Sequence, residues 1–420
     1  MRLSPLLVTL SAVLIAAVLL GGAWLLLRPS GPMLVSAEFD LQTLTPNADG
    51  DADVAVVRYR LARPATVSIY FLDSAGTRYN FRSDRPRESG AHEVLFSGIV
   101  EPFTRPGDEF PGQIRARLLP DGDYQWAIAA QEAGGAPEQT TGNLRVSGGL
   151  SGLPGIRNLS ASPDPFSPNQ DGINDRATLT LALAKEVPPE SGLRVVLIGV
   201  DGAQYPLGEQ GGVILPGRAG VHTFDYDGGI DQGEQPPPDG TYTVRAEAED
   251  AAGQKMMAET TLTLAHSGLP RAEILNAEVQ FSGATVLVGH TLFFTLTVEN
   301  YGTAPIRTFG PPPGTTYQQR ENANALGFYQ QDGAWRVGID CDTCIADYPW
   351  RWAVGWPEDL VQIDGQWYLP PGQRSIVTGG IVLTEIIAAR NPQYFWAGLI
   401  HEAVEVSNVN NRVDPFSVTI

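Results

Sequence analysis

Alternation of apolar and polar residues runs through most of this chain. Residues 54–61 and 65–72 follow a two-residue period, and residues 177–183 and 193–200 repeat it farther along. Such a period is typical of strands that bury one face. Turn-forming pairs such as Asp201-Gly202 separate the runs. The pattern therefore predicts an all-β chain built from many short strands.

The N-terminus departs from this pattern. Residues 6–27 contain no charged side chain. As a helix this stretch rises roughly 33 Å, enough to cross a hydrocarbon core of about 30 Å. A cleaved signal peptide, the alternative, has a shorter apolar region and a small-residue cleavage site. We therefore expect a retained transmembrane signal-anchor and linker over residues 1–32, which makes this a single-pass membrane protein with extracytoplasmic domains.

Two motifs recur along the chain. The first motif, TPNADGDAD at residues 45–53, recurs as SPNQDGIND at residues 167–175. Each copy is followed by the second motif, Pro-Asp-Gly-x-Tyr, at residues 120–124 and 238–242. Self-similarity of this kind indicates repeated modules. The predicted domains are a first β-sandwich at residues 33–149, a second at 150–267 and a third at 268–420.

Residues 160–264 resemble the Ig-like module named after the flagellar hook-capping protein. The resemblance is carried by FSPNxDGxND at residues 166–175 and PDGTY at residues 238–242. It holds more loosely over residues 34–146. That module recurs in bacterial surface and secreted proteins, so the resemblance implies tandem Ig-like sandwiches behind the N-terminal helix.

The C-terminal part is similar to a different module, the bacterial cell-adhesion-related (CARDB-type) Ig-like domain. It shares the opening VENYG at residues 298–302 and the closing EVSNVNN at residues 405–411. A long Trp-rich insertion at residues 314–371 departs from the pattern. The resemblance implies a β-sandwich used in adhesion, with unknown roles for the inserted loops.

Composition and motifs narrow the function class. The chain has 28 Lys and Arg against 47 Asp and Glu, a net charge of −19. Such an acidic surface repels phosphate backbones, so we expect no nucleic-acid partner. No nucleophile elbow, phosphate-binding loop, dinucleotide fingerprint or zinc-protease motif occurs in the sequence. We therefore expect that the protein is not an enzyme.

The repeated Asn-x-Asp-Gly motif offers candidate metal ligands. Calcium prefers six to eight oxygen ligands from carboxylates, amides and backbone carbonyls. Asn and Asp at these spacings also form Asx turns that cap a strand, and this alternative stays open. The candidate ligands for structural Ca²⁺ are Asn47, Asp49, Asp51 and Asp53 in the first copy, and Asn169, Asp171, the carbonyl of Ile173 and Asp175 in the second.

The only two cysteines, Cys341 and Cys344, are separated by two residues. Zinc would need two further Cys or His ligands, and the five histidines are scattered. Outside the cytoplasm a local disulfide is the preferred interpretation. Reduced thiols or an incomplete metal site are the alternatives.

Aromatic residues gather in the insertion. Trp350, Trp352 and Trp356 are the candidates for ligand binding, because exposed rings stack on sugars or anchor a protein partner. The alternation of Trp350 and Trp352 places both on one face of a strand. That placement fits equally well with packing in the core of an enlarged sandwich.

Together these observations predict a membrane-anchored, non-enzymatic adhesion or scaffold protein. It would present a distal binding domain to a cell-surface protein or a polysaccharide. The alternative function is a polysaccharide-binding surface protein that uses the aromatic residues of the insertion.

Overall fold

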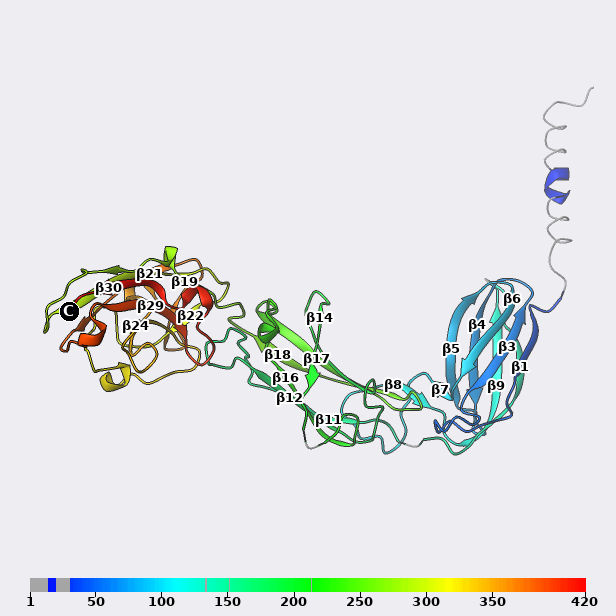
Figure 1. The fold of residues 1–420 in the computed structure, drawn as a ribbon. Coiled ribbons are helices and arrows are strands. Elements are labelled where there is room, and N and C mark those ends of the chain that lie inside the picture. Colours follow the sequence, from blue (N-terminus) through cyan, green and yellow to red (C-terminus); the bar gives the residue numbers. More distant parts are fainter. Residues whose placement is uncertain (1–13, 20–30, 133, 151, 213) are drawn as a thin grey trace, which may run out of the picture. The chain divides into compact units, whose positions relative to one another are not determined.

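The computed structural model describes residues 14–19, 31–132, 134–150, 152–212 and 214–420. The regular structure of the described residues consists almost entirely of β-strands, as the alternation predicts, and the chain divides into two compact units (Figure 1). Unit 1 comprises Met1–Asp108, Ile114–Leu153 and Glu249–Met256. Unit 2 comprises Glu109–Gln113, Pro154–Ala248 and Met257–Ile420.

The predicted membrane helix at residues 6–27 falls largely outside the described residues. Of that stretch, residues 14–19 are described and are helical. Among the described residues, none of the helices has the length and apolar character needed to span a membrane.

Unit 1 contains a first β-sandwich, here called sandwich 1. Its smaller sheet has the order β1-β3-β6 and its larger sheet the order β2-β10-β9-β4-β5. Alternate residues of β4, Val67, Ile69 and Phe71, point into a core that also holds Phe96 and Trp126. The strands are β1 (Leu34–Phe39), β2 (Thr43–Leu44), β3 (Ala55–Leu61), β4 (Ala65–Leu72), β5 (Arg78–Arg87), β6 (Gly90–Phe96), β9 (Gly122–Gln131) and β10 (Glu138–Val146). A short antiparallel pair, β7 (Ile99–Val100) and β8 (Gln113–Leu118), follows β6 in the chain.

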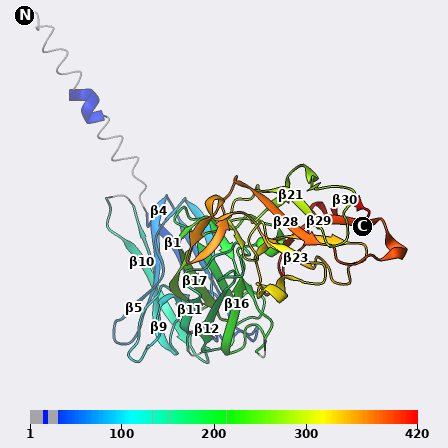
Figure 2. The same ribbon diagram turned by 90° about the vertical axis from the view of Figure 1, so that its left-hand side faces the viewer.

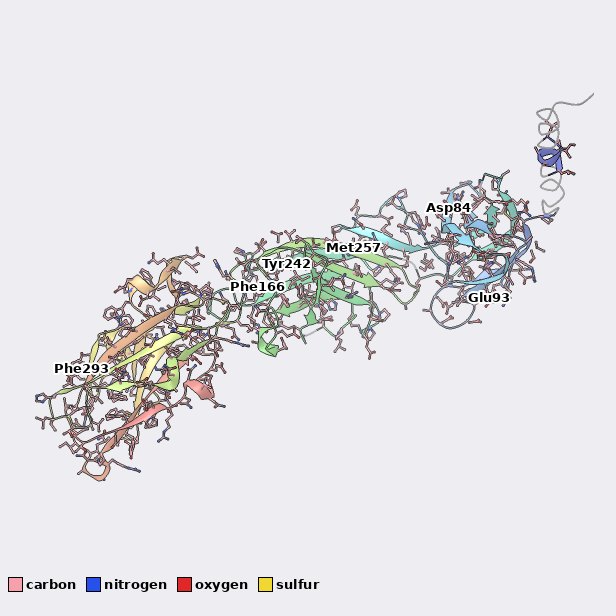
Figure 3. The ribbon with its side chains drawn as sticks, turned by 90° about the horizontal axis from the view of Figure 1, so that it is seen from above. Asp84, Glu93, Phe166, Tyr242, Met257 and Phe293 are labelled. Carbon is pink, nitrogen blue, oxygen red and sulfur yellow. A yellow bond between two sulfur atoms is a disulfide. The ribbon has the colours of Figure 1, made fainter. Side chains whose placement is uncertain are left out.

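Sandwich 2 lies in unit 2, except for the end of β17 and the start of β18, which fall in unit 1. One sheet has the order β11-β12-β16-β15, and β14, β13, β17 and β18 follow one another in the other. Its core holds Phe166 and Tyr242, which are labelled in Figure 3. The strands are β11 (Ile156–Ser162), β12 (Ala177–Leu183), β13 (Leu193–Ile198), β14 (Gln204–Pro206), β15 (Gly208–Glu209), β16 (Gly220–Tyr226), β17 (Gly240–Glu249) and β18 (Lys255–Leu264), with the 3-10 turn η1 (Ile230–Gln232) after β16.

Sandwich 3, also in unit 2, packs two further sheets around a separate core. The first has the order β19-β21-β28-β23, and its strands β21 and β28 run side by side in Figure 2. The second has the order β26-β27-β22-β24-β29-β30, with β25 paired to β24. The strands are β19 (Ala272–Ile274), β20 (Gln280–Phe281), β21 (Thr291–Asn300), β22 (Ile306–Thr308), β23 (Thr316–Gln318), β24 (Trp335–Cys341), β25 (Trp350–Ala353), β26 (Val361–Ile363), β27 (Gln366–Leu369), β28 (Arg374–Val382), β29 (Gln393–His401) and β30 (Val413–Val418). The 3-10 turns are η2 (Leu275–Ala277), η3 (Ala323–Leu326), η4 (Pro357–Asp359), η5 (Ala388–Arg390) and η6 (Asn408–Asn410).

The repeated Pro-Asp-Gly-x-Tyr motif forms the same tyrosine corner in sandwiches 1 and 2. The hydroxyl of Tyr124 donates to the carbonyl of Pro120 at 2.8 Å, and that of Tyr242 donates to the carbonyl of Pro238 at 2.7 Å. A Tyr that bonds back to the chain a few residues upstream fixes a corner in Ig-like sandwiches. The motif is thus a structural device at the start of β9 and β17.

The Asp of the same motif holds the segment that leaves each sandwich. Asp121 accepts backbone N–H bonds from residues 148 and 149 at 2.9 and 3.1 Å. Asp239 accepts them from residues 266 and 267 at 3.1 and 2.8 Å. One motif therefore positions both a strand start and a domain exit, which explains why its spacing recurs.

Candidate functional site

The first Asn-x-Asp-Gly loop folds around the carboxylate of Asp53. Oδ1 accepts the backbone N–H groups of Asn47 and Ala48 at 2.8 Å each, and Oδ2 accepts that of Gly50 at 2.6 Å. Positive φ angles at Ala48, Gly50 and Ala52 alternate with ordinary ones and turn successive N–H groups inward, as in an anion-binding nest. The hydrogen bond from Gly50, followed by those from Ala48 and Asn47, lowers the pKa of Asp53.

Asn47 and Asp49 of the first loop form Asx turns. Asn47 Oδ1 accepts the N–H of Asp49 at 2.9 Å, and Asp49 Oδ1 accepts that of Asp51 at 2.8 Å. Asp49 and Asp51 are exposed. The loop thus takes the Asx form that the sequence left open as an alternative to a metal site.

The second loop repeats the bond from its glycine and both Asx turns, whereas Oδ1 of Asp175 has a different partner from Oδ1 of Asp53. Asp175 Oδ1 accepts the N–H of Asp171 at 3.1 Å, and Oδ2 accepts that of Gly172 at 2.6 Å. Asn169 Oδ1 accepts from Asp171 at 3.0 Å, and Asp171 Oδ1 accepts from Ile173 at 2.8 Å. Positive φ angles recur at the matching positions, Gln170, Gly172 and Asn174. Equivalent sequences therefore give equivalent backbones.

The two loops differ in their surroundings, because sandwich 3 covers the second one. Asn169 is 1% and Asp171 5% exposed. Tyr368 donates its hydroxyl to Asp171 Oδ2 at 2.7 Å, and Arg307 Nε donates to the Asp171 carbonyl at 2.6 Å. His401 Nε2 lies 2.7 Å from the carbonyl oxygen of Gln170. We call this cluster the 2–3 joint.

Two glycines allow the backbones of the 2–3 joint to approach closely. A Cβ on Gly172 would lie 2.0 Å from the carbonyl oxygen of Asp332, and one on Gly333 would lie 2.0 Å from the carbonyl carbon of Asp171. Arg307 Nη2 donates to the same Asp332 carbonyl. No side chain fits at either position, so the joint requires glycine on both of its sides.

Burial shifts the titration of three groups at the joint. It raises the pKa of Asp175 to about 6, with the charge of Asp171 as the next cause. It also raises the pKa of Tyr368, which therefore stays a hydroxyl donor. Burial lowers the pKa of His401 to about 4, so the imidazole is neutral at pH 7 and its Nε2 donates to the carbonyl of Gln170.

The predicted calcium ligands are therefore gathered, but apart from Asp51 the side-chain ligands accept backbone N–H groups of their own loops. Among the described residues no group of three or more His, Cys, Asp or Glu side chains is arranged to hold a metal ion. In the second loop Asp171 Oδ2 also carries the Tyr368 hydroxyl. A cation would have to displace these hydrogen bonds, so calcium binding stays a prediction.

The disulfide prediction is confirmed. Cys341 and Cys344 are bonded, at the end of β24. Cys341 packs against the core of sandwich 3. The bond closes a short turn that leads toward β25.

The ligand-binding prediction for Trp350 and Trp352 is corrected. Their exposed fractions are 2% and 0%, and both belong to the core of sandwich 3. Trp352 packs edge-on against Phe294, with ring centroids 4.7 Å apart, and donates its Nε1–H to the carbonyl of Thr315 at 2.9 Å. Neither indole offers a face to a ligand, because burial in an enlarged core removes more apolar surface from water. Trp356 is half-buried, and its binding role stays a prediction.

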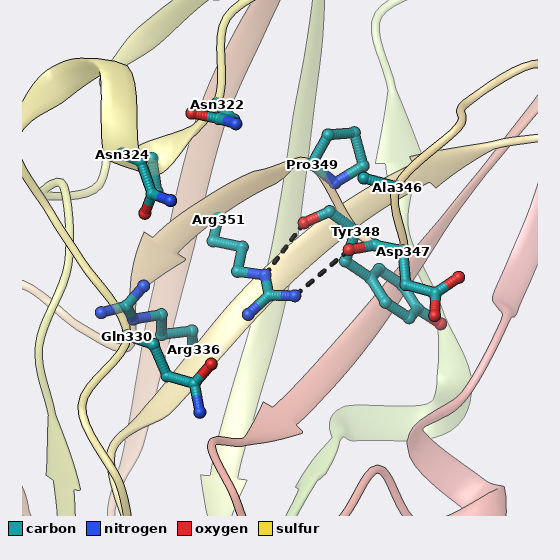
Figure 4. Close-up of a pocket in the computed structure, with 10 residues that line it drawn as sticks. Asn322, Asn324, Gln330, Arg336, Ala346, Asp347, Tyr348, Pro349 and Arg351 are labelled. Carbon is teal, nitrogen blue, oxygen red and sulfur yellow. Dashed lines mark hydrogen bonds between the residues drawn. The ribbon is translucent and has the colours of Figure 1, made fainter.

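A polar pocket that the sequence analysis missed opens beside β25 (Figure 4). Its volume is about 220 Å³. Arg351 donates Nε to the carbonyl of Tyr348 at 2.9 Å and Nη2 to that of Asp347 at 3.1 Å. Its Nη1 donates to Glu402 Oε1 at 2.7 Å. The lining residues are Asn322, Ala323, Asn324, Gln330, Arg336, Ala346, Asp347, Tyr348, Pro349 and Arg351.

The second arginine of this pocket is almost fully enclosed. Arg336 is 1% exposed, donates Nε to the carbonyl of Phe309 at 2.7 Å, and lies 3.5 Å from the same Glu402 oxygen. Burial, together with Arg351, lowers the pKa of Arg336, with Glu402 opposing. Two guanidinium groups thus share one buried carboxylate. No sequence motif predicts this arrangement, because Arg336 lies on β24, Arg351 on β25 and Glu402 after β29.

Comparisons with known proteins identify no family. No protein-family model matches this sequence, and no curated protein matches it. Among solved structures it is similar to a tetra-tandem repeat in the extending region of a large adhesion protein, at 12% identity over 87% of this chain and 81% of that chain, with a TM-score of 0.20.

Two further solved structures are similar at the same level. One is a DUF4785 family protein from Legionella pneumophila, at 10% identity over 91% of this chain and 85% of that one, with a TM-score of 0.22. The other is a Ca²⁺-stabilized adhesin with which an Antarctic bacterium binds ice, at 12% identity over 89% and 70%, with a TM-score of 0.23. TM-scores this low support no conclusion on function.

Proposed function

We propose that this chain is a membrane-anchored, extracytoplasmic and non-enzymatic adhesion or scaffold protein that presents its C-terminal sandwich to a ligand. The 2–3 joint carries the proposal. A protein that displays a binding domain needs that domain held in place. Here the second Asn-x-Asp-Gly loop is hydrogen-bonded to sandwich 3 through Tyr368, Arg307 and His401.

The joint has the properties of a fixed connection. Its buried polar groups are paired: Asp171 with Tyr368, and the carbonyls of Asp171 and Gln170 with Arg307 and His401. A buried network whose members are paired rigidifies its surroundings, since opening it would leave several groups unpaired at once.

The module resemblances extend this proposal. Sandwiches 1 and 2 are proposed as hook-capping-type Ig-like modules, because both carry the Asx loop and the tyrosine corner. Sandwich 3 is proposed as an enlarged CARDB-type module. The apolar N-terminal stretch at residues 6–27 is the proposed anchor.

Intact bacterial cells that make the full chain test the proposal. We expect protease added to spheroplasts to remove sandwich 3, and cells with the chain to attach to a protein-coated surface more than cells without it. Protection from protease in spheroplasts, or equal attachment, would contradict the proposal.

A pair of variants tests the role of the joint in the same cells. Gly172→Ala introduces a methyl group 2.0 Å from the Asp332 carbonyl oxygen, whereas a Cβ on Gly50, in the matching loop position, meets nothing within 4 Å. Both glycines have positive φ, so both variants carry similar backbone strain. We expect attachment to fall in Gly172→Ala and to be retained in Gly50→Ala.

A further inference from the structure

The polar pocket beside β25 carries more positive than negative charge at its floor. Arg336 and Arg351 both line it, and both pair with one carboxylate, that of Glu402. Arg336 is 1% exposed, and it donates Nε to the carbonyl of Phe309 at 2.7 Å and Nη2 to the carbonyl of Tyr329. Guanidinium groups that line a cavity are suited to binding carboxylates, because their N–H groups match the two carboxylate oxygens.

The two other acidic side chains near the pocket, Asp347 and Asp340, do not pair with its arginine side chains. Asp347 lines the rim, is exposed, and in Figure 4 its carboxylate turns away from the Arg351 guanidinium. Asp340 lies on β24, does not line the pocket, and accepts the N–H of Cys341 at 2.8 Å. Burial raises the pKa of Asp340, which favours its neutral form.

Side-chain amides complete the polar lining. Asn322 uses its Oδ1 to cap η3 by accepting the N–H of Ala325 at 3.0 Å, which leaves its NH₂ group for another partner. Asn324 and Gln330 are exposed at the same opening. The side-chain NH₂ groups of these amides can donate hydrogen bonds to a bound carboxylate.

A second pocket of about 520 Å³ adjoins the first and shares Asn322, Ala346 and Pro349 with it. Its walls are partly apolar and partly charged, and the charged residues are Arg320, Glu321 and Glu385. The Cys341–Cys344 disulfide, Ile345 and Ile387 contribute to its walls. Trp350 and Gln393 lie at its floor, 2% and 1% exposed, and the Nε1 of Trp350 and Nε2 of Gln393 have no hydrogen-bond partner in the described residues. The two pockets together offer cationic and apolar surface side by side.

We propose that these adjoining pockets bind a peptide segment of a partner protein in which a carboxylate stands next to an apolar side chain. The carboxylate would accept from Arg351 and Arg336, and the apolar side chain would lie between Ile345 and Ile387. A sugar is the poorer occupant, because the aromatic rings that line the two pockets are at most 5% exposed and present no stacking surface; they are Tyr348, Trp350 and Phe395.

This inference deepens the proposed function and rests on it only in that sandwich 3 must be presented to a partner. Binding of a small probe to the purified full chain is measured separately from attachment and protease access. A failure of the pocket and a failure of the presentation role are therefore distinguishable.

The test uses N-acetyl-leucine, which joins a carboxylate to an apolar side chain, and N-acetyl-leucinamide, which lacks the charge. Binding to the full chain is followed by ligand-observed NMR. We expect the amide to bind about tenfold or more weakly, the loss that follows removal of a hydrogen bond between charged groups. Arg351→Met should cause a similar loss for N-acetyl-leucine, while Arg58→Met, which breaks only an exposed pair with Glu93 in sandwich 1, should leave binding unchanged.

Glu402→Gln guards against a merely structural effect of the arginine change. Removing the carboxylate that the two arginines share should strengthen N-acetyl-leucine binding. Equal binding of acid and amide, no binding of either, or unaltered binding in Arg351→Met would overturn the proposal. Stronger binding of glucuronate than of N-acetyl-leucine would overturn it in favour of an acidic sugar.

Discussion

The hydroxyl of Tyr368 donates a hydrogen bond of 2.7 Å to Oδ2 of Asp171. This bond joins β27 of sandwich 3 to the Asx loop of sandwich 2. The equivalent residue of the first loop, Asp49, is exposed and accepts from the loop itself. One copy of the motif is therefore a free turn, and the other is the centre of a joint.

Removal of this hydroxyl tests its contribution. Tyr368→Phe leaves the buried carboxylate of Asp171 without that donor, so we expect a loss of about 1–3 kcal/mol in the free energy of unfolding. Urea denaturation of the full chain measures it. Tyr394→Phe is the control, because Tyr394 is 46% exposed. Equal stability of the two variants would exclude an energetic role for the Tyr368 bond.

The glycine pair separates strain from steric conflict. Gly50→Ala should cost about 1–2 kcal/mol, because its positive φ disfavours a Cβ. Gly172→Ala adds a methyl group at 2.0 Å from a carbonyl oxygen, so its loss of stability should be clearly larger. Thermal unfolding of both variants measures the difference. Equal losses of stability would show that the close approach of Gly172 to the Asp332 carbonyl contributes nothing to the stability of the protein.

The raised pKa of Asp175 predicts a dependence on pH. A carboxyl whose pKa rises from 3.8 to about 6 on folding is protonated more readily in the folded state, so its contribution to stability grows as pH falls through 6. Asp175→Asn lacks this gain. We therefore expect the variant to lose stability relative to the parent protein between pH 6 and pH 4, as measured by urea midpoints. A constant difference across that range would contradict the shift.

His401 acts in the opposite direction in the same pH range. Its pKa falls from 6.5 to about 4 on folding, so its contribution is present above pH 6.5 and is lost as pH falls toward 4. Comparison of His401→Gln with the parent protein isolates this effect. The variant should become relatively more stable on acidification, and a variant that became relatively less stable would refute the assignment.

Calcium binding is tested by thermal unfolding of the full chain in millimolar calcium and in chelator. A ligand present at a hundredfold excess over its Kd stabilises the folded state by about 2.7 kcal/mol. We expect Asp49→Asn to remove any such gain and Asp171→Asn to leave it, because Asp171 Oδ2 is already bonded to Tyr368. An unchanged midpoint in calcium would leave both loops as Asx turns.

The tryptophans of the insertion differ in their predicted cost of removal. Trp352→Ala should destabilise the protein by about 3–5 kcal/mol, since the ring is fully buried in a packed core. Trp356→Ala should cost much less, because Trp356 is half-buried. Chemical denaturation measures both, and equal costs would contradict the placement of Trp352.

Much of the architecture was predictable because it depends on local pattern. Alternation placed Val67, Ile69 and Phe71 on one face of a strand, and the structure buries all three. The Asx loop could be anticipated as well, since Asn47 and Asp49 bond to backbone groups only two residues away. The sequence has only two cysteines, so Cys341–Cys344 was the one disulfide possible within the chain.

The sequence by itself determined the β-strand character, the repeated corner at Tyr124 and Tyr242, and the similar Asx turns of the two loops. Only the tertiary structure decided that Trp350 and Trp352 lie in the core, that Asp171 meets Tyr368, and that Arg336 and Arg351 share Glu402. The physical reason is the sequence separation of the interacting residues. Turns and strands follow from interactions over a few residues, whereas burial and charge pairing depend on which distant strands pack together.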